Sequence, residues 1–421
     1  PNTYEQEMWN GFIRHRIPIH WGGLGDPFDA YERKFGVGLQ CLDIIREVGY
    51  PTFICFKGDT LFLPEYREVI ESSDNLVFQV SLNNVNDHLS ARIEKGAPVP
   101  SVRLKAMRML VDMGKTVYWR MRPFVIGMTD VDMEQQFEAV AEATRGKCVA
   151  MSTEFMALTT LAEPALQALY DDMSKHLGYD VTSYYQALSR PIDSNRRLNP
   201  EVKERHVLKA WELCRKYGMS FAISDPHFKE LNDSCNCCGV PKTDPILGTY
   251  TIGQQTEAIL IAKRKGHVTW SDMSQAMEWS KEFGNAGEYF NLGSKKGHDR
   301  EKFTTIFEHL RGLWNNPNAS ASPYRYFWGK LKPRMEPDVE GDLIYDYVPS
   351  RYEIEDPRFT RTDQTQKNCG SCGACGFKNV AYQGDDGHQG DLVQIDPETP
   401  RVDTVRTRKQ RKRDILSRMF G

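Results

Sequence analysis

The chain has 421 residues and a formal net charge of −3; 40% of its residues are hydrophobic and 26% are charged. This length and composition are typical of globular proteins and leave room for two or three domains. The sequence contains no run of 18 apolar residues and no recognisable secretory leader. We therefore expect no membrane partner and a cytoplasmic location.

Short apolar strands and amphipathic helices alternate over the first 225 residues. We predict strands at 17–21, 52–56, 76–82, 116–122, 148–153 and 220–224. We predict helices at 38–48, 64–71, 101–113, 132–144 and 200–217, the last with Asn199 as N-cap and Pro200 in its first turn. The strands are rich in Val, Ile, Phe and Tyr, which indicates burial on both faces. The alternation predicts a parallel sheet, either open or closed into a barrel.

The pattern changes after Asp225. Residues 233–250 read as a loop rich in Cys, Gly and Pro, residues 251–332 as mostly helical, and residues 333–400 as a Pro-, Asp- and Gly-rich segment. Residues 401–421 hold eight basic and two acidic residues, so this tail carries +6 and the rest of the chain −9. We divide the chain into a barrel-like part (1–232), a cysteine-rich extension (233–400) and a basic tail (401–421). The tail is either a solvated terminus or a contact for nucleic acid.

Six of the ten cysteines fall into two tight groups, a pattern that indicates metal binding in a reducing compartment. The predicted metal ligands are Cys235, Cys237, Cys238, Cys369, Cys372 and Cys375. The CxxCxxC run at 369–375 favours an iron–sulfur cluster, with structural zinc as the alternative. We interpret Cys41, Cys55, Cys148 and Cys214 as core residues.

The first predicted strand ends in His20-Trp21-Gly22-Gly23, followed by Gly25-Asp26-Pro27-Phe28. With Lys57 and Ser81 at the ends of the next two strands, and with the later segments 93–98 and 120–124, this stretch resembles the radical S-adenosylmethionine (SAM) superfamily. Within that superfamily it is similar to the branch of spore photoproduct lyase and DNA repair photolyases. The resemblance covers roughly residues 17–130.

The resemblance implies a partial (β/α)6 TIM-like barrel that lacks its first strand. It also implies SAM and 4Fe–4S clusters as cofactors, a 5′-deoxyadenosyl radical that abstracts hydrogen, and an electron donor such as flavodoxin or ferredoxin. The substrate would be a nucleic acid or a peptide. The implied cofactor-binding residues are Gly22, Gly23, Asp26, Lys57, Ser81, Arg120 and Arg122. Arg120 or Arg122 would pair with a carboxylate.

Two features depart from the family. The sequence contains no CxxxCxxC motif, and it begins at Pro1 shortly before a strand, so we expect that the first strand and its cysteines are missing. The hydrogen-donating cysteine of the lyase would fall near Gly23, where no cysteine stands. A catalytic residue therefore cannot be assigned. The alternatives are a non-catalytic, zinc- or iron–sulfur-stapled protein that binds nucleic acid, and a ferredoxin-like module fused to another enzyme.

Overall fold

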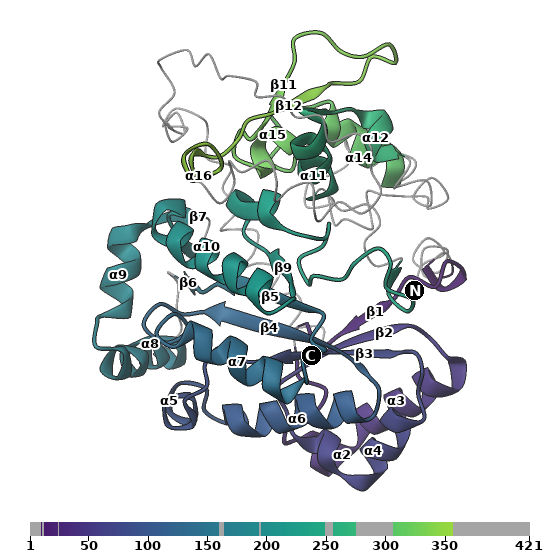
Figure 1. Cartoon of the computed structure of the whole chain (residues 1–421), viewed down its shortest axis with the longest axis vertical. Coiled ribbons are helices and arrows are strands. Elements are labelled where there is room, and N and C mark those ends of the chain that lie inside the picture. The colour runs from purple at the N-terminus through teal and green to yellow at the C-terminus, as the bar shows by residue number, and fades with distance from the viewer. Residues whose placement is uncertain are drawn as a thin grey trace, which may run out of the picture. The chain divides into compact units, whose positions relative to one another are not determined.

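The computed structural model describes residues 10, 12–23, 25–159, 164–192, 195–248, 256–274 and 306–356 (Figure 1). All of them belong to the first of two compact units, which ends at Arg361. The predicted ligands Cys369, Cys372 and Cys375 and the basic tail lie outside the described residues. Within the described part, no helix is long and apolar enough to cross a membrane.

The centre of this unit is a parallel sheet of six strands, as the alternating pattern predicts. Its strands are β1 (Ile19–Trp21), β2 (Thr52–Phe56), β3 (Leu76–Ser81), β4 (Thr116–Phe124), β5 (Ala150–Phe155) and β9 (Ser220–Ile223), in the spatial order β1-β2-β3-β4-β5-β9. Every neighbouring pair is parallel. The carboxyl ends of all six strands therefore meet at one edge of the sheet.

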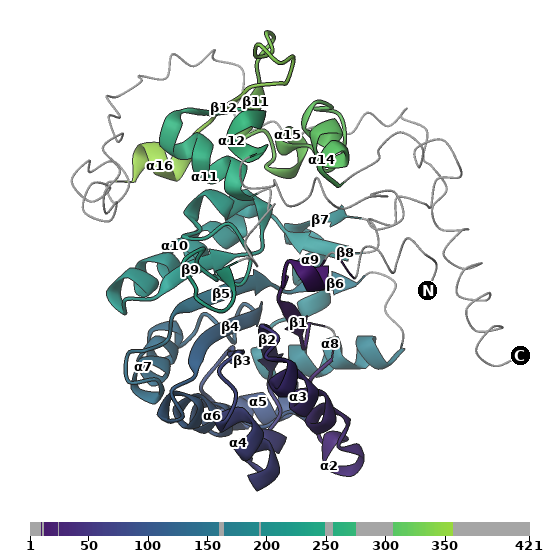
Figure 2. The same ribbon diagram turned by 90° about the vertical axis from the view of Figure 1, so that its right-hand side faces the viewer.

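Helices connect the strands. They are α2 (Glu32–Phe35), α3 (Val37–Val48), α4 (Pro64–Glu71), α5 (Asp87–Ile93), α6 (Pro100–Asp112), α7 (Met133–Ala143) and α10 (Pro200–Lys216), with a short 3-10 turn, η1 (Thr60–Phe62). Figures 1 and 2 show α3, α4, α6 and α7 on the same side of the sheet. Side chains on that face, such as Ile54 and Phe56 of β2, join the main hydrophobic core. The α/β class predicted from the sequence is confirmed.

The opposite face of the sheet is also buried. Phe53 and Cys55 alternate with the core residues of β2 and pack with Cys238, Val240 and Leu247 of the loop that follows η2 (Pro226–Leu231). This inner face accounts for the strands that read as apolar on both sides. The loop that we placed in the extension thus packs directly on the sheet. The domain boundary at 232/233 stays a prediction.

Two small antiparallel sheets complete the unit. Between β5 and α10 lie β6 (Ala157–Thr159), α8 (Pro164–Leu177), α9 (Val181–Leu188), β7 (Ser189–Ile192) and β8 (Asn195–Leu198), in a sheet ordered β6-β8-β7. Beyond the loop lie α11 (Thr256–Lys265), β10 (His267–Val268), α12 (Trp270–Ser274), α14 (Ile306–Trp314), α15 (Pro323–Tyr326), β11 (Leu331–Pro333), β12 (Tyr345–Tyr347) and α16 (Arg351–Glu355). This second group has its own core around Trp270, Trp314, Phe327 and Tyr345. The described part of the extension is therefore helical with one small sheet.

Two local predictions need correction. Strand β4 runs on to Phe124, past the predicted end at Arg122. The strand tolerates Pro123, which has no N–H, because the register with β5 shifts between Met121 and Phe124. Asn199 occupies the N-cap position of α10, but its side chain makes no capping hydrogen bond. Pro200 stands in the first turn of α10, as predicted.

Candidate functional site: a cavity at the carboxyl edge of the sheet

A cavity of about 550 Å³ lies at the carboxyl ends of strands β1 to β5. Parallel α/β proteins commonly bind ligands at this edge, and the volume is within the usual range for small-molecule sites. Its lining residues are Gly22, Gly23, Gly25, Asp26, Cys55, Phe56, Lys57, Ser81, Arg120, Arg122, Pro123, Glu154, Phe155, Met156 and Ala157. All seven residues predicted to bind cofactor are among them. Their role in binding stays a prediction.

The glycine-rich loop after β1 forms one wall of the cavity. Gly22 has φ +94°, and a Cβ there would lie 1.8 Å from the Cys55 carbonyl oxygen, so only glycine fits against β2. At Gly23 the nearest atom to an added Cβ is 4.0 Å away, and at Gly25 nothing lies within 4 Å. The main chain at Gly23 and Gly25 therefore borders open space, where a ligand can approach it closely.

Asp26 shapes the same wall. One oxygen of its carboxylate, Oδ1, accepts a hydrogen bond from the Phe28 amide at 2.9 Å. The other, Oδ2, accepts from the amides of Lys57 at 2.6 Å and Gly58 at 2.8 Å. These bonds tie the loop after β1 to the end of β2. The structure thus gives Asp26 a role in holding the wall together, in addition to its place on the lining.

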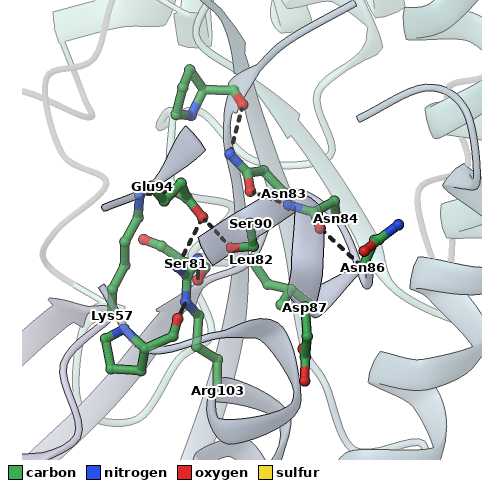
Figure 3. A network of polar contacts seen from close by, with 12 residues as sticks. Lys57, Ser81, Leu82, Asn83, Asn84, Asn86, Asp87, Ser90, Glu94 and Arg103 are labelled. Atoms are coloured by element: carbon green, nitrogen blue, oxygen red, sulfur yellow. Dashed lines mark hydrogen bonds and ion pairs between the residues drawn. The ribbon is translucent and has the colours of Figure 1, made fainter. Parts of the chain in front are cut away.

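Lys57 and Ser81 follow on the ends of β2 and β3. The Lys57 ammonium forms an ion pair with Glu94, and Arg103 pairs with the other oxygen of that carboxylate at 2.8 Å (Figure 3). Arg103 also donates to the Ser81 carbonyl oxygen at 3.2 Å. Burial would raise the pKa of Glu94, but Arg103 and Lys57 outweigh it and lower this pKa. The carboxylate is therefore charged at neutral pH.

The two arginines of β4 have different surroundings. The buried Arg122 contacts Glu154 at 3.5 Å and donates a hydrogen bond to the Cys237 carbonyl oxygen. Arg120 lies beside the Cys55 thiol and, within the described residues, makes no ion pair. The sequence left open which arginine would pair with a ligand carboxylate. The geometry favours Arg120, because Arg122 already has a carboxylate and a carbonyl partner, whereas Arg120 makes no ion pair among the described residues.

Cys55 belongs to the cavity wall, which the sequence analysis missed. Its thiol donates to Gln79 Oε1 at 3.1 Å and lies 3.0 Å from His20 Nε2. Burial raises the pKa of Cys55 to about 11, so it is a neutral thiol at pH 7. The strand's period of two carried the missing signal, because Cys55 alternates with Ile54 and Phe56 and must face the other side of the sheet.

The loop that carries the first cysteine group lies over the inner face of the sheet. The Asn236 side chain organises it by accepting from the amides of Cys238 and Val240, both at 3.0 Å. The side-chain amide of Gln79 donates a hydrogen bond to the Cys238 carbonyl oxygen at 3.3 Å and anchors the loop to β3. Cys235 and Cys238 are buried, whereas Cys237 is partly exposed.

Cys237 and Cys238 form a close thiol pair, with Sγ atoms 3.8 Å apart. The hydrogen bond from Cys238 lowers the pKa of Cys237, and nearby Arg122 and Lys229 lower it further. Burial lowers the pKa of Lys229 to about 8. Two thiolates on one tetrahedral ion, with metal–sulfur bonds of about 2.3 Å, lie about 3.8 Å apart. The pair thus has the spacing to bind one metal ion, and Cys237 is the member whose pKa is lowered, whereas the pKa of Cys238 is raised.

Within the described residues, no three His, Cys, Asp or Glu side chains converge as metal ligands. A metal held by Cys237 and Cys238 would need a further ligand, and Cys369, Cys372 and Cys375 lie outside the described part. The assignment of the six cysteines as ligands therefore stays a prediction.

His227, which follows β9, has structural partners. Its Nδ1 lies 2.7 Å from Asp225 Oδ1, and its ring packs on Trp328 with centroids 4.4 Å apart. Asp225 also pairs with the buried Lys203 of α10. Through these contacts, His227 links the segment after β9 to the segment after α15.

No family model matches this chain, and no curated protein matches it. Among solved structures, a mutant spore photoproduct lyase with dinucleoside spore photoproduct aligns at 10% identity and a TM-score of 0.39, over 51% of this chain and 65% of the lyase. Streptococcus suis SuiB bound to S-adenosylmethionine aligns at 14% identity and a TM-score of 0.28, over 54% of this chain and 53% of SuiB. SuiB bound to precursor peptide SuiA aligns at 14% identity and a TM-score of 0.27. At such values these likenesses establish neither a family nor an activity.

Proposed function

We propose that this chain is a radical SAM enzyme that binds S-adenosylmethionine in the cavity at the carboxyl edge of its sheet. The observation that carries the proposal is that seven residues, chosen from the sequence for this role, line one cavity of about 550 Å³. They come from four different strand ends and span residues 22 to 122, so their convergence is a property of the fold rather than of one motif.

The lining has the chemistry that such a ligand needs. Arg120 is a guanidinium suited to a carboxylate, and the main chain at Gly23 and Gly25 is open to close approach. Phe155, Met156 and Ala157 offer an apolar shelf for a purine on the β5 side of the cavity. Lys57 and Ser81 add polar groups at the ends of β2 and β3. In these roles the residues bind and orient the ligand and exclude water from it.

When bound together, a reduced 4Fe–4S cluster and SAM supply a 5′-deoxyadenosyl radical, which abstracts hydrogen from a substrate. The cysteines that hold that catalytic cluster would come from a CxxxCxxC segment outside this sequence. Cys235, Cys237, Cys238, Cys369, Cys372 and Cys375 would hold one or more auxiliary clusters. The finer assignments within this proposal are lyase-type chemistry, a nucleic acid or peptide as substrate, and a flavodoxin- or ferredoxin-type electron donor.

Isothermal titration of the chain with SAM tests the binding step without requiring catalysis. We expect saturable binding at one site, and Arg120→Met is expected to weaken it. An absence of heat or of competition by S-adenosylhomocysteine would remove the proposal. The reaction is tested on the protein that includes its upstream coding segment, reconstituted anaerobically with iron and sulfide. Under reduction it should form 5′-deoxyadenosine, and no cleavage of SAM would exclude the radical step.

A second candidate function is a non-catalytic, metal-stapled protein that binds nucleic acid. The observation in its favour is the 3.8 Å between Cys237 Sγ and Cys238 Sγ, the spacing expected on a single tetrahedral zinc ion. Metal analysis separates the zinc-stapled form of this candidate from the first, because the first requires iron and its brown chromophore. Deletion of residues 401–421 should then weaken nucleic-acid binding and flatten its salt dependence.

A further inference from the structure

We propose that Glu94 is a positioning residue: it holds the Lys57 ammonium at the cavity wall, and Arg103 fixes Glu94 for this task. The inference rests on the proposed binding of SAM in this cavity. It concerns a residue that lies outside the cavity lining and acts only through Lys57 (Figure 3).

The Glu94 carboxylate is almost enclosed, with 10% of its side chain exposed. One oxygen, Oε1, pairs with the Lys57 ammonium. The other, Oε2, lies 2.8 Å from Arg103 Nη2 and accepts a hydrogen bond from the Ser90 hydroxyl at 3.2 Å. A buried carboxylate with a cation on each oxygen has little freedom to turn. Its position therefore determines where the Lys57 ammonium lies.

Arg103 is the rigid end of this network. Its side chain has no exposed surface; two of its nitrogens donate hydrogen bonds, and the third makes the ion pair with Glu94 without hydrogen-bond geometry. Nε donates to the Pro98 carbonyl oxygen at 2.7 Å, Nη1 donates to the Ser81 carbonyl oxygen at 3.2 Å, and Nη2 faces Glu94. The guanidinium thus connects the cavity end of β3 with Glu94, the C-cap residue of α5.

The network restricts the Lys57 side chain before a ligand binds. A long lysine side chain loses rotamer entropy when it is immobilised. Here the Asp26 carboxylate already holds the Lys57 amide at 2.6 Å, and Glu94 holds the ammonium, so much of that entropy is lost before a ligand arrives. An ammonium has three donor hydrogens, and the side chain is 29% exposed, which leaves donors for a ligand.

The charges of the network also suit an anionic group. Lys57 and Arg103 carry two positive charges and Glu94 carries one negative charge, so the network adds a net +1 beside the cavity. A single buried Glu94–Lys57 pair would be neutral. With Arg103 present, Glu94 holds the ammonium while the wall keeps a positive potential toward a ligand carboxylate.

A double-mutant cycle on the full chain tests the proposal, with SAM and S-adenosylhomocysteine as titrants. Glu94→Gln keeps the shape of the side chain and releases Lys57, and we expect about 3- to 10-fold weaker binding. Lys57→Met should weaken binding at least as much. In the Lys57→Met background, the change at Glu94 should have no further effect, because Glu94 acts through that ammonium.

Stability is measured on the same variants, since Glu94→Gln leaves the buried Arg103 without its carboxylate. Glu94→Asp is the second variant: it keeps the charge beside Arg103, withdraws the carboxylate by one methylene, and should lose part of the affinity. Asp172→Asn is the matched control, because it removes a carboxylate from the exposed pair with Lys95 and should leave affinity unchanged.

Wild-type affinity in folded Glu94→Gln or Glu94→Asp would overturn the proposal, as would independent effects of Glu94 and Lys57 in the cycle. If the unmodified chain itself failed to bind SAM, the proposed function would fall first. The two failures are distinguishable, because only the second abolishes binding in the unmodified chain.

Discussion

The two sides of the cavity are held in different ways. On the side of β1 to β3, the contacts at the cavity edge are made within residues 22–103: Asp26 holds the main chain of β2, and Glu94 pairs with Lys57 and Arg103. Away from that edge, the Gln79 side chain of β3 makes one longer contact, to the Cys238 carbonyl oxygen. On the side of β4 and β5, the contacts reach far along the chain, from Arg122 to the Cys237 carbonyl and from Tyr118 to Asp244. The first side is built by the strand–loop units themselves, whereas the second depends on a loop that arrives after β9.

The two sides of the cavity also supply different chemical groups. The β1–β3 side supplies open main chain and a lysine whose charge is already paired. The β4–β5 side supplies Arg120, without an ion pair among the described residues, and the thiol pair under Arg122. We infer that the first side sets the form of the cavity and that the second side carries the reactive groups.

The largest expected effect is a loss of stability on substitution of Gly22, where the loop after β1 packs closely against β2. Gly22→Ala would place a Cβ 1.8 Å from the Cys55 carbonyl oxygen at a φ of +94°, so the loop must move. We expect a loss of about 3 kcal/mol or more in the free energy of unfolding. Urea denaturation measures it.

Gly25→Ala is the control for this substitution, because nothing lies within 4 Å of an added Cβ there. It should stay within about 0.5 kcal/mol of the unmodified chain. Equal losses at the two glycines would contradict the close packing of the loop on β2.

The second effect distinguishes the two arginines of β4. Arg122→Met removes the donor to the Cys237 carbonyl and the cation beside Glu154, and we expect a loss of about 1–3 kcal/mol in stability. Arg120→Met should change stability by less than about 0.5 kcal/mol and weaken SAM binding by roughly 10-fold or more. Thermal unfolding and calorimetric titration of both variants measure the two quantities.

The opposite pattern, with Arg120 required for stability and Arg122 for binding alone, would overturn the division between them. A similar change of both quantities in both variants would mean that the arginines act as one unit.

The sequence predicted the β1–β3 side better than the β4–β5 side, for a physical reason. Strand period and loop glycines are local signals, and they placed Gly22, Lys57 and Ser81 at strand ends that must share one edge. The partner of Arg122 is 115 residues away, and the partner of Tyr118 is 126 residues away. No periodicity records such a contact. The sequence analysis also made no prediction for the helices α8 and α9, although their signals are local.

The smallest effect is a difference in thiol reactivity between the two sides. The hydrogen bond from Cys238, with Arg122 and Lys229, lowers the pKa of Cys237, whereas burial raises the pKa of Cys55 to about 11. The thiolate is the reactive form, so at pH 6.5 iodoacetamide should alkylate the partly exposed Cys237 well before Cys55. Peptide mapping by mass spectrometry after timed labelling of chelator-treated protein measures both rates.

Raising the pH sharpens this comparison, and the sign follows from the two shifts. Cys237 is already a thiolate at pH 6.5, so its rate should change little between pH 6.5 and 8.5. A group with a pKa near 11 gains thiolate about tenfold for each pH unit below that value, so Cys55 should speed up about 100-fold over the same range. Cys237→Ser should abolish the fast phase of labelling, and a fast phase that survives this substitution would place the reactive thiolate elsewhere.

Added zinc should suppress this fast phase if the Cys237–Cys238 pair binds one ion, because a metal-bound thiolate is shielded from the reagent.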